Sequence, residues 1–185
     1  MNWYKEEFAA KSDVLVIALG SAYDKAYDSS KFEWFNTTDS LSTITKFKKL
    51  FLKDMIYGWY QSQYEGLEGP GPHYIAKFIK EKVKESGVKR TLILGASMGG
   101  YGAILLGCLA NLELAVSISP QTYLSEARYK KYKLEEKFVG LNVNKEETDL
   151  KVILEKYGNN YTQYHLYFGK YNSGDVAYAT RISHF

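Results

Sequence analysis

The sequence predicts an α/β fold built around a mostly parallel sheet with helices on both of its faces. Short apolar runs recur along the chain, most clearly at residues 14–19 and 91–94, and each ends at a glycine. Segments whose apolar residues have helical spacing lie between these runs, and proline or glycine marks several of their ends. Strands that alternate with helices in this way form parallel sheets with right-handed crossover connections.

The first strand is expected at residues 14–19, where an uninterrupted aliphatic run suits a strand buried on both faces. A weaker strand follows at residues 49–53. The first helix is expected at residues 73–86, because Pro72 suits a first helical turn and Gly87 suits a helix end. The remaining elements are a strand at 91–94, a helix at 98–109, a strand at 114–118, helices at 125–138 and 148–157, a strand at 161–168 and a helix at 174–182.

The composition is that of one ordinary globular domain spanning residues 1–185, with 45% hydrophobic and 24% charged residues. The net charge of +3 is too small to indicate a nucleic-acid partner. The single cysteine, Cys108, excludes an internal disulfide and a cysteine-based zinc site, and we expect no cofactor or metal. The N-terminal residues lack the apolar stretch of a signal peptide, and residues 14–19 are too few to cross a bilayer. We therefore expect a cytoplasmic protein without membrane insertion.

A serine lies between glycines at the junction of an expected strand and an expected helix. A strand that turns directly into a helix strains the residue at the apex and requires small residues two positions to either side. Gly95 and Gly99 meet that requirement around Ser97. The Ser97 hydroxyl would stand at a helix N-terminus, whose free N–H groups favour a developing oxyanion. We expect the N–H of Met98 to be the first oxyanion donor and an N–H at Ser21, after the first strand, to be the second.

This spacing has a simpler interpretation, which is a tight strand-to-helix turn in an α/β protein without a catalytic serine. Two other functions of glycine-rich turns are excluded. A dinucleotide site requires the motif G-x-G-x-x-G, and a phosphate-binding loop requires glycine and lysine followed by serine or threonine; neither motif is present. A nucleophile at Ser97 and a plain turn are therefore the alternatives.

Residues 92–104, Leu-Ile-Leu-Gly-Ala-Ser-Met-Gly-Gly-Tyr-Gly-Ala-Ile, resemble the nucleophile elbow of the α/β-hydrolase superfamily. Residues 117–121 are similar to the strand end that follows the elbow in small bacterial members, and residues 169–182 to the segment that carries the family's acid. The resemblance implies an α/β-hydrolase-like three-layer sandwich. It also implies a small serine hydrolase, such as an esterase, that forms an acyl-enzyme at Ser97.

The order serine, acid, histidine in this family directs the search for the acid to the region after a late strand. Asp175 fits, because it follows the strand expected at residues 161–168 and a glycine-containing loop. Asp149 is the second candidate. For either aspartate the alternative role is to cap a helix N-terminus, a position that favours this residue type.

The three histidines of the chain fit the role of the base poorly. If the residues after Asp175 are helical, His184 lies about 13 Å from it along the helix axis, at the wrong end of that helix. His165 lies inside an expected strand, below the catalytic edge. His73 begins a helix at the correct edge, but it precedes the serine in the chain, and lining the substrate pocket suits it better.

The resemblance predicts one more strand and a loop with a histidine after the last helix. We therefore hypothesise that the chain is shortened at its C-terminus or has lost its last strand. The alternatives are a pseudo-enzyme and a site based on His73. A serine without a base is a weak nucleophile, because the base must take the hydroxyl proton.

Aromatic residues gather in two loops that follow expected strands. Residues 54–72 are rich in tyrosine, glycine and proline, and residues 32–39 form a second aromatic and polar insertion. Such a loop at the catalytic edge suits a pocket wall or a lid, and the alternative is a surface loop whose aromatic rings fold onto the core. An acyl chain or a sugar ring would fit such a pocket. Its expected residues are Gly20, Trp59, Tyr60, His73 and Gln121.

The sequence thus predicts an esterase or thioesterase whose ligand is a small acyl ester or an acylated glycan. Short hydrolase-like proteins of bacterial surface-glycan systems look similar in the loop regions, which favours an O-acylated sugar. The alternative is a non-catalytic ligand-binding or scaffold protein with the same fold.

Overall fold

The computed structural model describes residues 3–22, 32–137 and 148–185 of the chain. Six strands form one sheet in the spatial order β1-β3-β2-β4-β5-β6. Strand β1 pairs antiparallel with β3, and the other neighbouring strands are parallel. The predicted, mostly parallel sheet is therefore confirmed. The strands are β1 (Tyr4–Glu7), β2 (Val14–Leu19), β3 (Lys48–Leu52), β4 (Arg90–Ala96), β5 (Leu114–Ile118) and β6 (Gln163–Tyr167).

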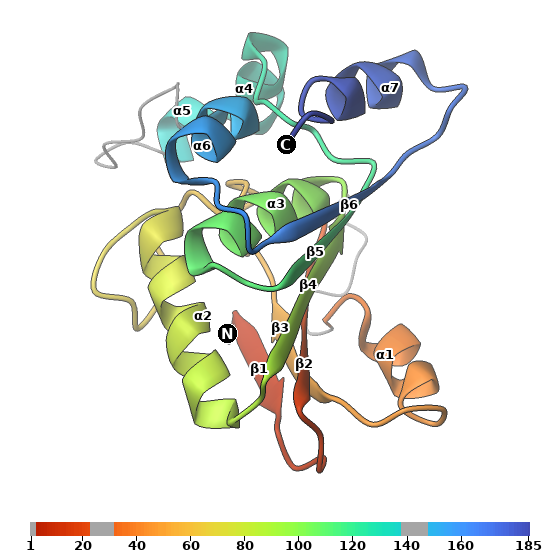
Figure 1. Ribbon diagram of the computed structural model, residues 1–185. Helices are drawn as coiled ribbons and strands as arrows, with labels where there is room; N and C mark the ends of the chain where they lie inside the picture. The colour runs from red at the N-terminus through yellow and green to blue at the C-terminus, as the bar shows by residue number, and fades with distance from the viewer. Residues whose placement is uncertain (1–2, 23–31, 138–147) are drawn as a thin grey trace.

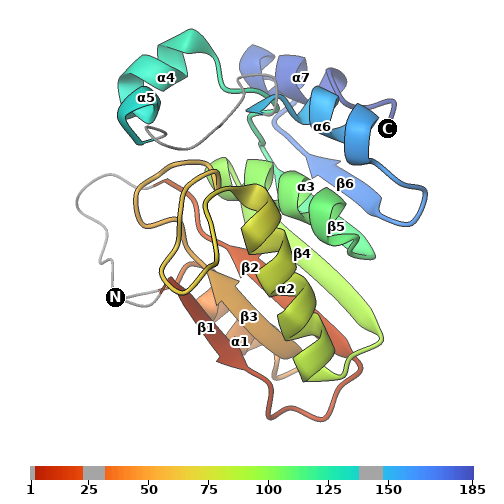
Figure 2. The same ribbon diagram turned by 90° about the vertical axis from the view of Figure 1, so that its left-hand side faces the viewer.

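Helices lie on both faces of the sheet. Helix α1 (Phe35–Leu41) lies on one face, and α2 (Pro72–Ser86) and α3 (Met98–Ala110) pack against each other on the opposite face (Figure 1). A further group of helices lies at the end of the molecule where α3 begins (Figure 2). This group consists of α4 (Glu126–Tyr132), α5 (Leu134–Lys137), α6 (Leu150–Tyr157) and α7 (Ser173–Thr180). The layers are those of the predicted three-layer α/β sandwich. Within the residues described, no helix is both long enough and apolar enough to span a bilayer.

The predicted helix at residues 125–138 is wrong as a single element. Lys133 separates α4 from α5, because its backbone has a φ of 51° and its N–H bonds back to the carbonyls of Lys130 and Tyr129. A left-handed residue of this kind ends an α-helix. The sequence patterns also did not indicate β1 or α1. Strand β1 is a polar edge strand, and α1 carries few apolar residues.

Helix α3 lies at the centre of the core. Nearly all of its residues are buried, and it packs against α2, β4 and β5. A helix that is apolar on all sides is typical of such a central position. Gly102 allows a close approach near its first turn, since a Cβ there would lie 2.5 Å from the Tyr60 ring. The start of α3 is thereby packed closely against the loop that follows β3.

Candidate active site

The turn between β4 and α3 holds Ser97 in a strained backbone conformation. Its φ is 52° and its ψ is −115°, values that a residue with a side chain rarely adopts. The neighbouring glycines make the turn sterically feasible. A Cβ on Gly95 would lie 2.3 Å from the carbonyl oxygen of Gly99, and a Cβ on Gly99 would lie 2.6 Å from the carbonyl oxygen of Leu19. The predicted strain at Ser97 and the need for both glycines are therefore present.

Met98 and Ser21, the residues whose N–H groups are the expected oxyanion donors, both lie next to the Ser97 turn. Met98 is the first residue of α3, so its N–H has no partner within that helix. Ser21 follows β2, and its hydroxyl donates a hydrogen bond of 2.7 Å to the carbonyl oxygen of Ala96, the residue before Ser97. The structure thus brings the Ser21 segment against the Ser97 turn.

The peptide group between Gly20 and Ser21 is held from both sides. The hydroxyl of Tyr60 donates a hydrogen bond of 2.8 Å to the Gly20 carbonyl oxygen. The N–H of Ser21 donates to the Glu33 carboxylate at 2.5 Å, and the Ser21 hydroxyl lies 3.3 Å from the other carboxylate oxygen. Because a peptide group is planar and its C=O and N–H point in opposite directions, the contact with Tyr60 also fixes the direction of the Ser21 N–H.

Tyr60 is a buried hydrogen-bond donor. Burial raises the pKa of its hydroxyl well above the ordinary value of 10.0, and the nearby charges of Asp54 and Glu33 raise it further. Its backbone N–H donates a hydrogen bond of 2.8 Å to the Asp54 carboxylate at the end of β3. The loop around it is strained, because Tyr57, Trp59 and Tyr60 all have a φ between 54° and 58°.

The aromatic rings of this loop are part of the core. Trp59 and Tyr60 are each 1% exposed, and the Trp59 ring lies against Tyr132 of α4, with 4.7 Å between the ring centroids. The side-chain amide of Gln61 donates to the hydroxyl of Tyr101, which ties the loop to α3. Of the two alternatives for this loop, the structure therefore has the aromatic rings folded onto the core. Tyr60 reaches the Ser97 region through its hydroxyl.

The segment after β5 connects Ser97 with the candidate acid. The Gln121 side-chain amide donates a hydrogen bond of 3.1 Å to the Ser97 hydroxyl oxygen. Two residues earlier, the Ser119 hydroxyl donates to the Asp175 carboxylate at 2.9 Å. Ser119 also has a φ of 45°, and its N–H bonds to the Tyr167 carbonyl oxygen at the end of β6. A strained turn thus places these two side chains between the serine and the aspartate.

The two aspartates considered as the acid have different surroundings. Asp175 lies in the first turn of α7, and the helix cap is Asn172, whose side chain accepts the N–H groups of Gly174 and Asp175. Asn172, and not Asp175, therefore caps the N-terminus of α7. Asp149 does cap α6, and both of its carboxylate oxygens also bond to the guanidinium of Arg181. Asp149 is thus fully engaged in joining α6 to α7.

The three histidines have other surroundings in the described part of the chain. The His73 ring packs against Tyr157, and the His184 ring packs against Phe185. His165 is exposed on β6. In the described part of the chain, no hydrogen bond joins any of these side chains to Ser97 or Asp175. Nor do His, Cys, Asp or Glu side chains gather there in a group of three that could hold a metal ion.

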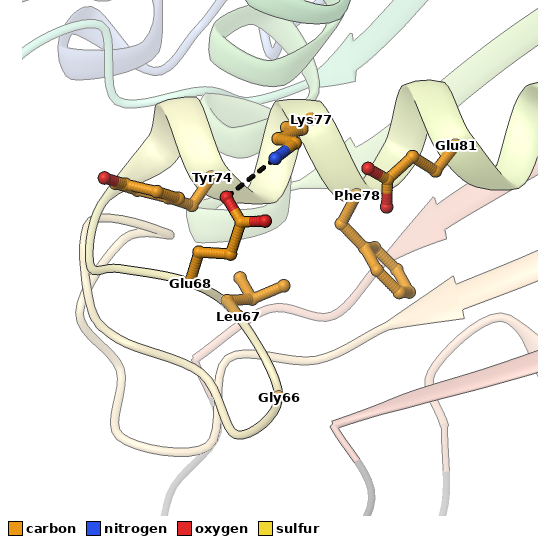
Figure 3. A pocket seen from close by; sticks show the side chains of 7 residues that line it. All are labelled: Gly66, Leu67, Glu68, Tyr74, Lys77, Phe78 and Glu81. Atoms are coloured by element: carbon orange, nitrogen blue, oxygen red, sulfur yellow. Dashed lines mark hydrogen bonds and ion pairs between the residues drawn. The ribbon is translucent and has the colours of Figure 1, made fainter.

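One pocket of about 100 Å³ lies between α2 and the loop that precedes it (Figure 3). The Lys77 ammonium lies 2.7 Å from the Glu68 carboxylate across this pocket. The residues that line the pocket are Gly66, Leu67, Glu68, Tyr74, Lys77, Phe78 and Glu81. None of them contributes to the Ser97 turn. The pocket therefore marks where the loop attaches to α2.

Sequence reasoning did not assign a role to Glu33 or Ser119, and it treated Tyr60 as an aromatic wall of the pocket. Glu33 contacts Ser21, which lies 12 positions away, whereas Tyr60 and Ser119 contact residues much farther along the chain. Tyr60 and Gly20 are 40 positions apart, and Ser119 and Asp175 are 56 positions apart. No local motif signals such contacts.

The fold was compared with solved structures. Capsule O-acetyltransferase of Neisseria meningitidis serogroup A is 21% identical, with a TM-score of 0.72 over 100% of this chain and 78% of that one. The fluorophosphonate-binding serine hydrolase FphF of Staphylococcus aureus is 17% identical, with a TM-score of 0.62 over 92% and 72%. The S-formylglutathione hydrolase FrmB of the same species is 17% identical, with a TM-score of 0.52 over 93% and 70%. No family model and no curated protein sequence matches the chain. The structural similarities show an α/β-hydrolase-type fold, as the sequence predicted.

Proposed function

We propose that the protein acts on carboxylic esters or thioesters and that Ser97 is its nucleophile. The observation that carries this proposal is the strained turn that presents the Ser97 hydroxyl at the start of α3, beside the Gly20–Ser21 peptide group. The proposal is supported by the fold, which is shared with ester-acting hydrolases and an O-acetyltransferase. An esterase or thioesterase is the reaction type we favour.

In the proposed first step, the Ser97 hydroxyl oxygen attacks the carbonyl carbon of the ester, and its proton passes to a general base. The carbonyl oxygen becomes an oxyanion that accepts hydrogen bonds from the N–H groups of Met98 and Ser21. Collapse of this intermediate breaks the bond to the alcohol or thiol, which leaves with the proton from the base. Water, or the hydroxyl of an acceptor, then attacks the acyl-enzyme and releases Ser97.

The general base is the component that the described residues do not provide. Asp175 is the proposed acid, and its role would be to orient an imidazole beside the Ser97 hydroxyl. Its carboxylate already accepts the Ser119 hydroxyl at 2.9 Å, and Gln121 of the same segment contacts Ser97. These two contacts support the proposal that the base acts next to the segment from Ser119 to Gln121.

The Ser21 N–H must also change partner before it can bind an oxyanion. In the structure it donates to the Glu33 carboxylate at 2.5 Å. A carboxylate is itself an anion that accepts hydrogen bonds, so it competes directly with a substrate oxyanion for this donor. Substrate binding in the proposed mechanism therefore displaces Glu33 from Ser21.

An O-acylated sugar is the substrate class that we propose. The support is indirect: one protein with the same fold is a capsule O-acetyltransferase, and it has also been solved in complex with CoA. Acyl transfer to a sugar hydroxyl and hydrolysis of a sugar ester share the same acyl-enzyme and differ only in the group that attacks it. Acetyl esters of sugars, assayed with and without a sugar acceptor, separate the two outcomes.

A second candidate function is a ligand-binding protein without catalysis. It is favoured by the absence of a histidine contact to Ser97 in the described part of the chain, and by the carboxylate on the Ser21 N–H. A fluorophosphonate probe distinguishes the two functions, because it forms a covalent bond only with an activated serine. Labelling of the full-length protein, lost in Ser97→Ala, supports the enzyme; retention of ligand binding without labelling supports the binding protein.

A further inference from the structure

We infer that Gln121 makes the Ser97 site selective for esters that carry an N–H or O–H donor next to the acyl group. This inference rests on the proposed function, since it takes Ser97 as the group that contacts the acyl carbon. The favoured ligands share an N–H or O–H group that lies a few atoms from the ester oxygen. A partly acylated sugar provides such a donor through the free hydroxyl beside the ester.

The orientation of Gln121 is set by its contact with Ser97. Its Nε2 donates to the Ser97 hydroxyl oxygen at 3.1 Å. Because Oε1 and Nε2 are bonded to the same carbon of the amide, Oε1 also lies close to the Ser97 hydroxyl. The amide carbonyl of glutamine can only accept hydrogen bonds.

The Oε1 atom of Gln121 is buried and has no hydrogen-bond partner within the residues that the structure describes. The neighbouring polar side chains of the same segment are paired. The Ser119 hydroxyl donates to Asp175, and the Thr122 hydroxyl donates to the Tyr178 carbonyl oxygen. Buried polar atoms in folded proteins are almost always paired, so an unpaired acceptor beside the proposed nucleophile offers a hydrogen-bond position to a ligand.

The consequence for recognition is asymmetric. A ligand with a donor gains a hydrogen bond to Oε1 when it binds, whereas a ligand that lacks the donor leaves this acceptor unpaired, as it is in the free protein. Sites that contain a buried polar group of this kind reject analogues that lack its partner more strongly than apolar pockets reject a missing methylene. Gln121 is therefore expected to favour esters with a donor through the hydrogen bond that only they can form.

The test compares 2-hydroxyethyl acetate with 2-methoxyethyl acetate, which differ by one methyl group on the second oxygen. Only the first can donate to Oε1. With the full-length protein, we expect kcat/KM for the hydroxyl ester to exceed that for the ether by about tenfold, equivalent to about 1.4 kcal/mol. In Gln121→Met, which removes both polar atoms, the ratio falls to about one. In Gln121→Glu, which keeps an acceptor, the preference remains although the absolute rate changes.

Gln163→Met is the matched control, because Gln163 is exposed at the start of β6 and its substitution leaves the ratio unchanged. Equal rates for the two esters in the natural protein, or an unchanged ratio in Gln121→Met, overturn the inference. A preference for the ether also overturns it, since it requires the opposite orientation of the amide. Labelling of Ser97 by a fluorophosphonate is measured in parallel. Labelling without the ester preference refutes the role of Gln121 alone, whereas neither labelling nor turnover refutes the proposed function as well.

Discussion

The hydroxyl of Tyr60 lies 2.8 Å from the carbonyl oxygen of Gly20 and donates a hydrogen bond to it. This contact connects the strained aromatic loop after β3 with the peptide group whose N–H, at Ser21, is a proposed oxyanion donor. Hydrogen bonds in such a series polarise one another, so donation to the carbonyl strengthens the N–H of the same peptide as a donor. Tyr60 is thus proposed to position the oxyanion donor without touching the substrate.

Tyr60→Phe is expected to slow the reaction of Ser97 with a fluorophosphonate by about tenfold, because the Ser21 N–H loses its fixed direction. For ester turnover, kcat falls while KM changes little. Tyr101→Phe is the matched control. Tyr101 is also fully buried, and its hydroxyl pairs with Gln61 and Thr148 rather than with Gly20.

Both of these variants lose a buried hydrogen bond, so each is expected to lower the free energy of unfolding by about 1–3 kcal/mol. Only the Tyr60 variant should also lose reactivity. A proportional loss of reactivity in both variants would show that Tyr60 acts through stability alone.

The free energy of unfolding at alkaline pH provides a further prediction for the same tyrosines. Burial raises the pKa of Tyr60 and Tyr101 above the ordinary value of 10.0. A raised folded-state pKa gives a contribution to stability that is complete below about pH 10 and is lost as the pH rises further, because the unfolded chain releases its proton first. Urea unfolding at about pH 8 and about pH 11 measures this loss. It should be smaller in either Tyr→Phe variant, by up to about 1.4 kcal/mol per pH unit above pH 10. An unchanged loss contradicts the burial of these hydroxyls.

Glu33→Gln is expected to increase the rate of Ser97 labelling several-fold, since a neutral amide competes less strongly than a carboxylate for the Ser21 N–H. The backbone amide resonance of Ser21 should shift upfield in the variant, which reports the lost contact independently of activity. Glu81→Gln is the control. Glu81 lies on α2 beside the pocket of Figure 3, and its substitution changes the net charge by the same amount. A slower reaction in Glu33→Gln would show that the carboxylate assists the site.

Asp175 and Asp149 can be separated by a pair of asparagine substitutions. Asp175→Asn is expected to lower kcat by at least about a hundredfold while the unfolding free energy changes little, because its carboxylate is proposed to stabilise the protonated base. Asp149→Asn keeps a capping oxygen on α6 but loses the ion pair with Arg181. It should lower the free energy of unfolding by about 1 kcal/mol and leave kcat nearly unchanged. The reverse pattern would assign the acid to Asp149.

Much of the fold could be predicted because its central elements have strong local signatures. The run at Val14–Leu19 is aliphatic throughout, and the glycines on either side of Ser97 indicate a tight turn without reference to the rest of the chain. In a parallel sheet the carboxyl ends of the strands lie at the same edge, so the loops that follow β2 and β4 are expected there together. For the same reason, the meeting of the Ser21 segment with the Ser97 turn was predictable.

The contacts that organise the candidate site were less predictable. The break at Lys133 requires a positive φ at a residue type with no preference for it. The hydrogen bonds of Tyr60 to Gly20 and of Ser119 to Asp175 depend on how strained loops fold back over long sequence separations. Local periodicity carries no information about such pairings. Sequence reasoning therefore proposed Ser97, Asp175 and Gln121 as site residues but not the contacts made by Tyr60 and Ser119.

The identity of the nucleophile is the central claim, and one measurement addresses it directly. The full-length protein is incubated with a fluorophosphonate, and the modified peptide is identified by mass spectrometry. We expect one adduct on Ser97, none in Ser97→Ala, and an unchanged adduct in Ser183→Ala, which replaces an exposed serine near α7. Absence of an adduct from the folded natural protein, or an adduct on another serine, would contradict the account.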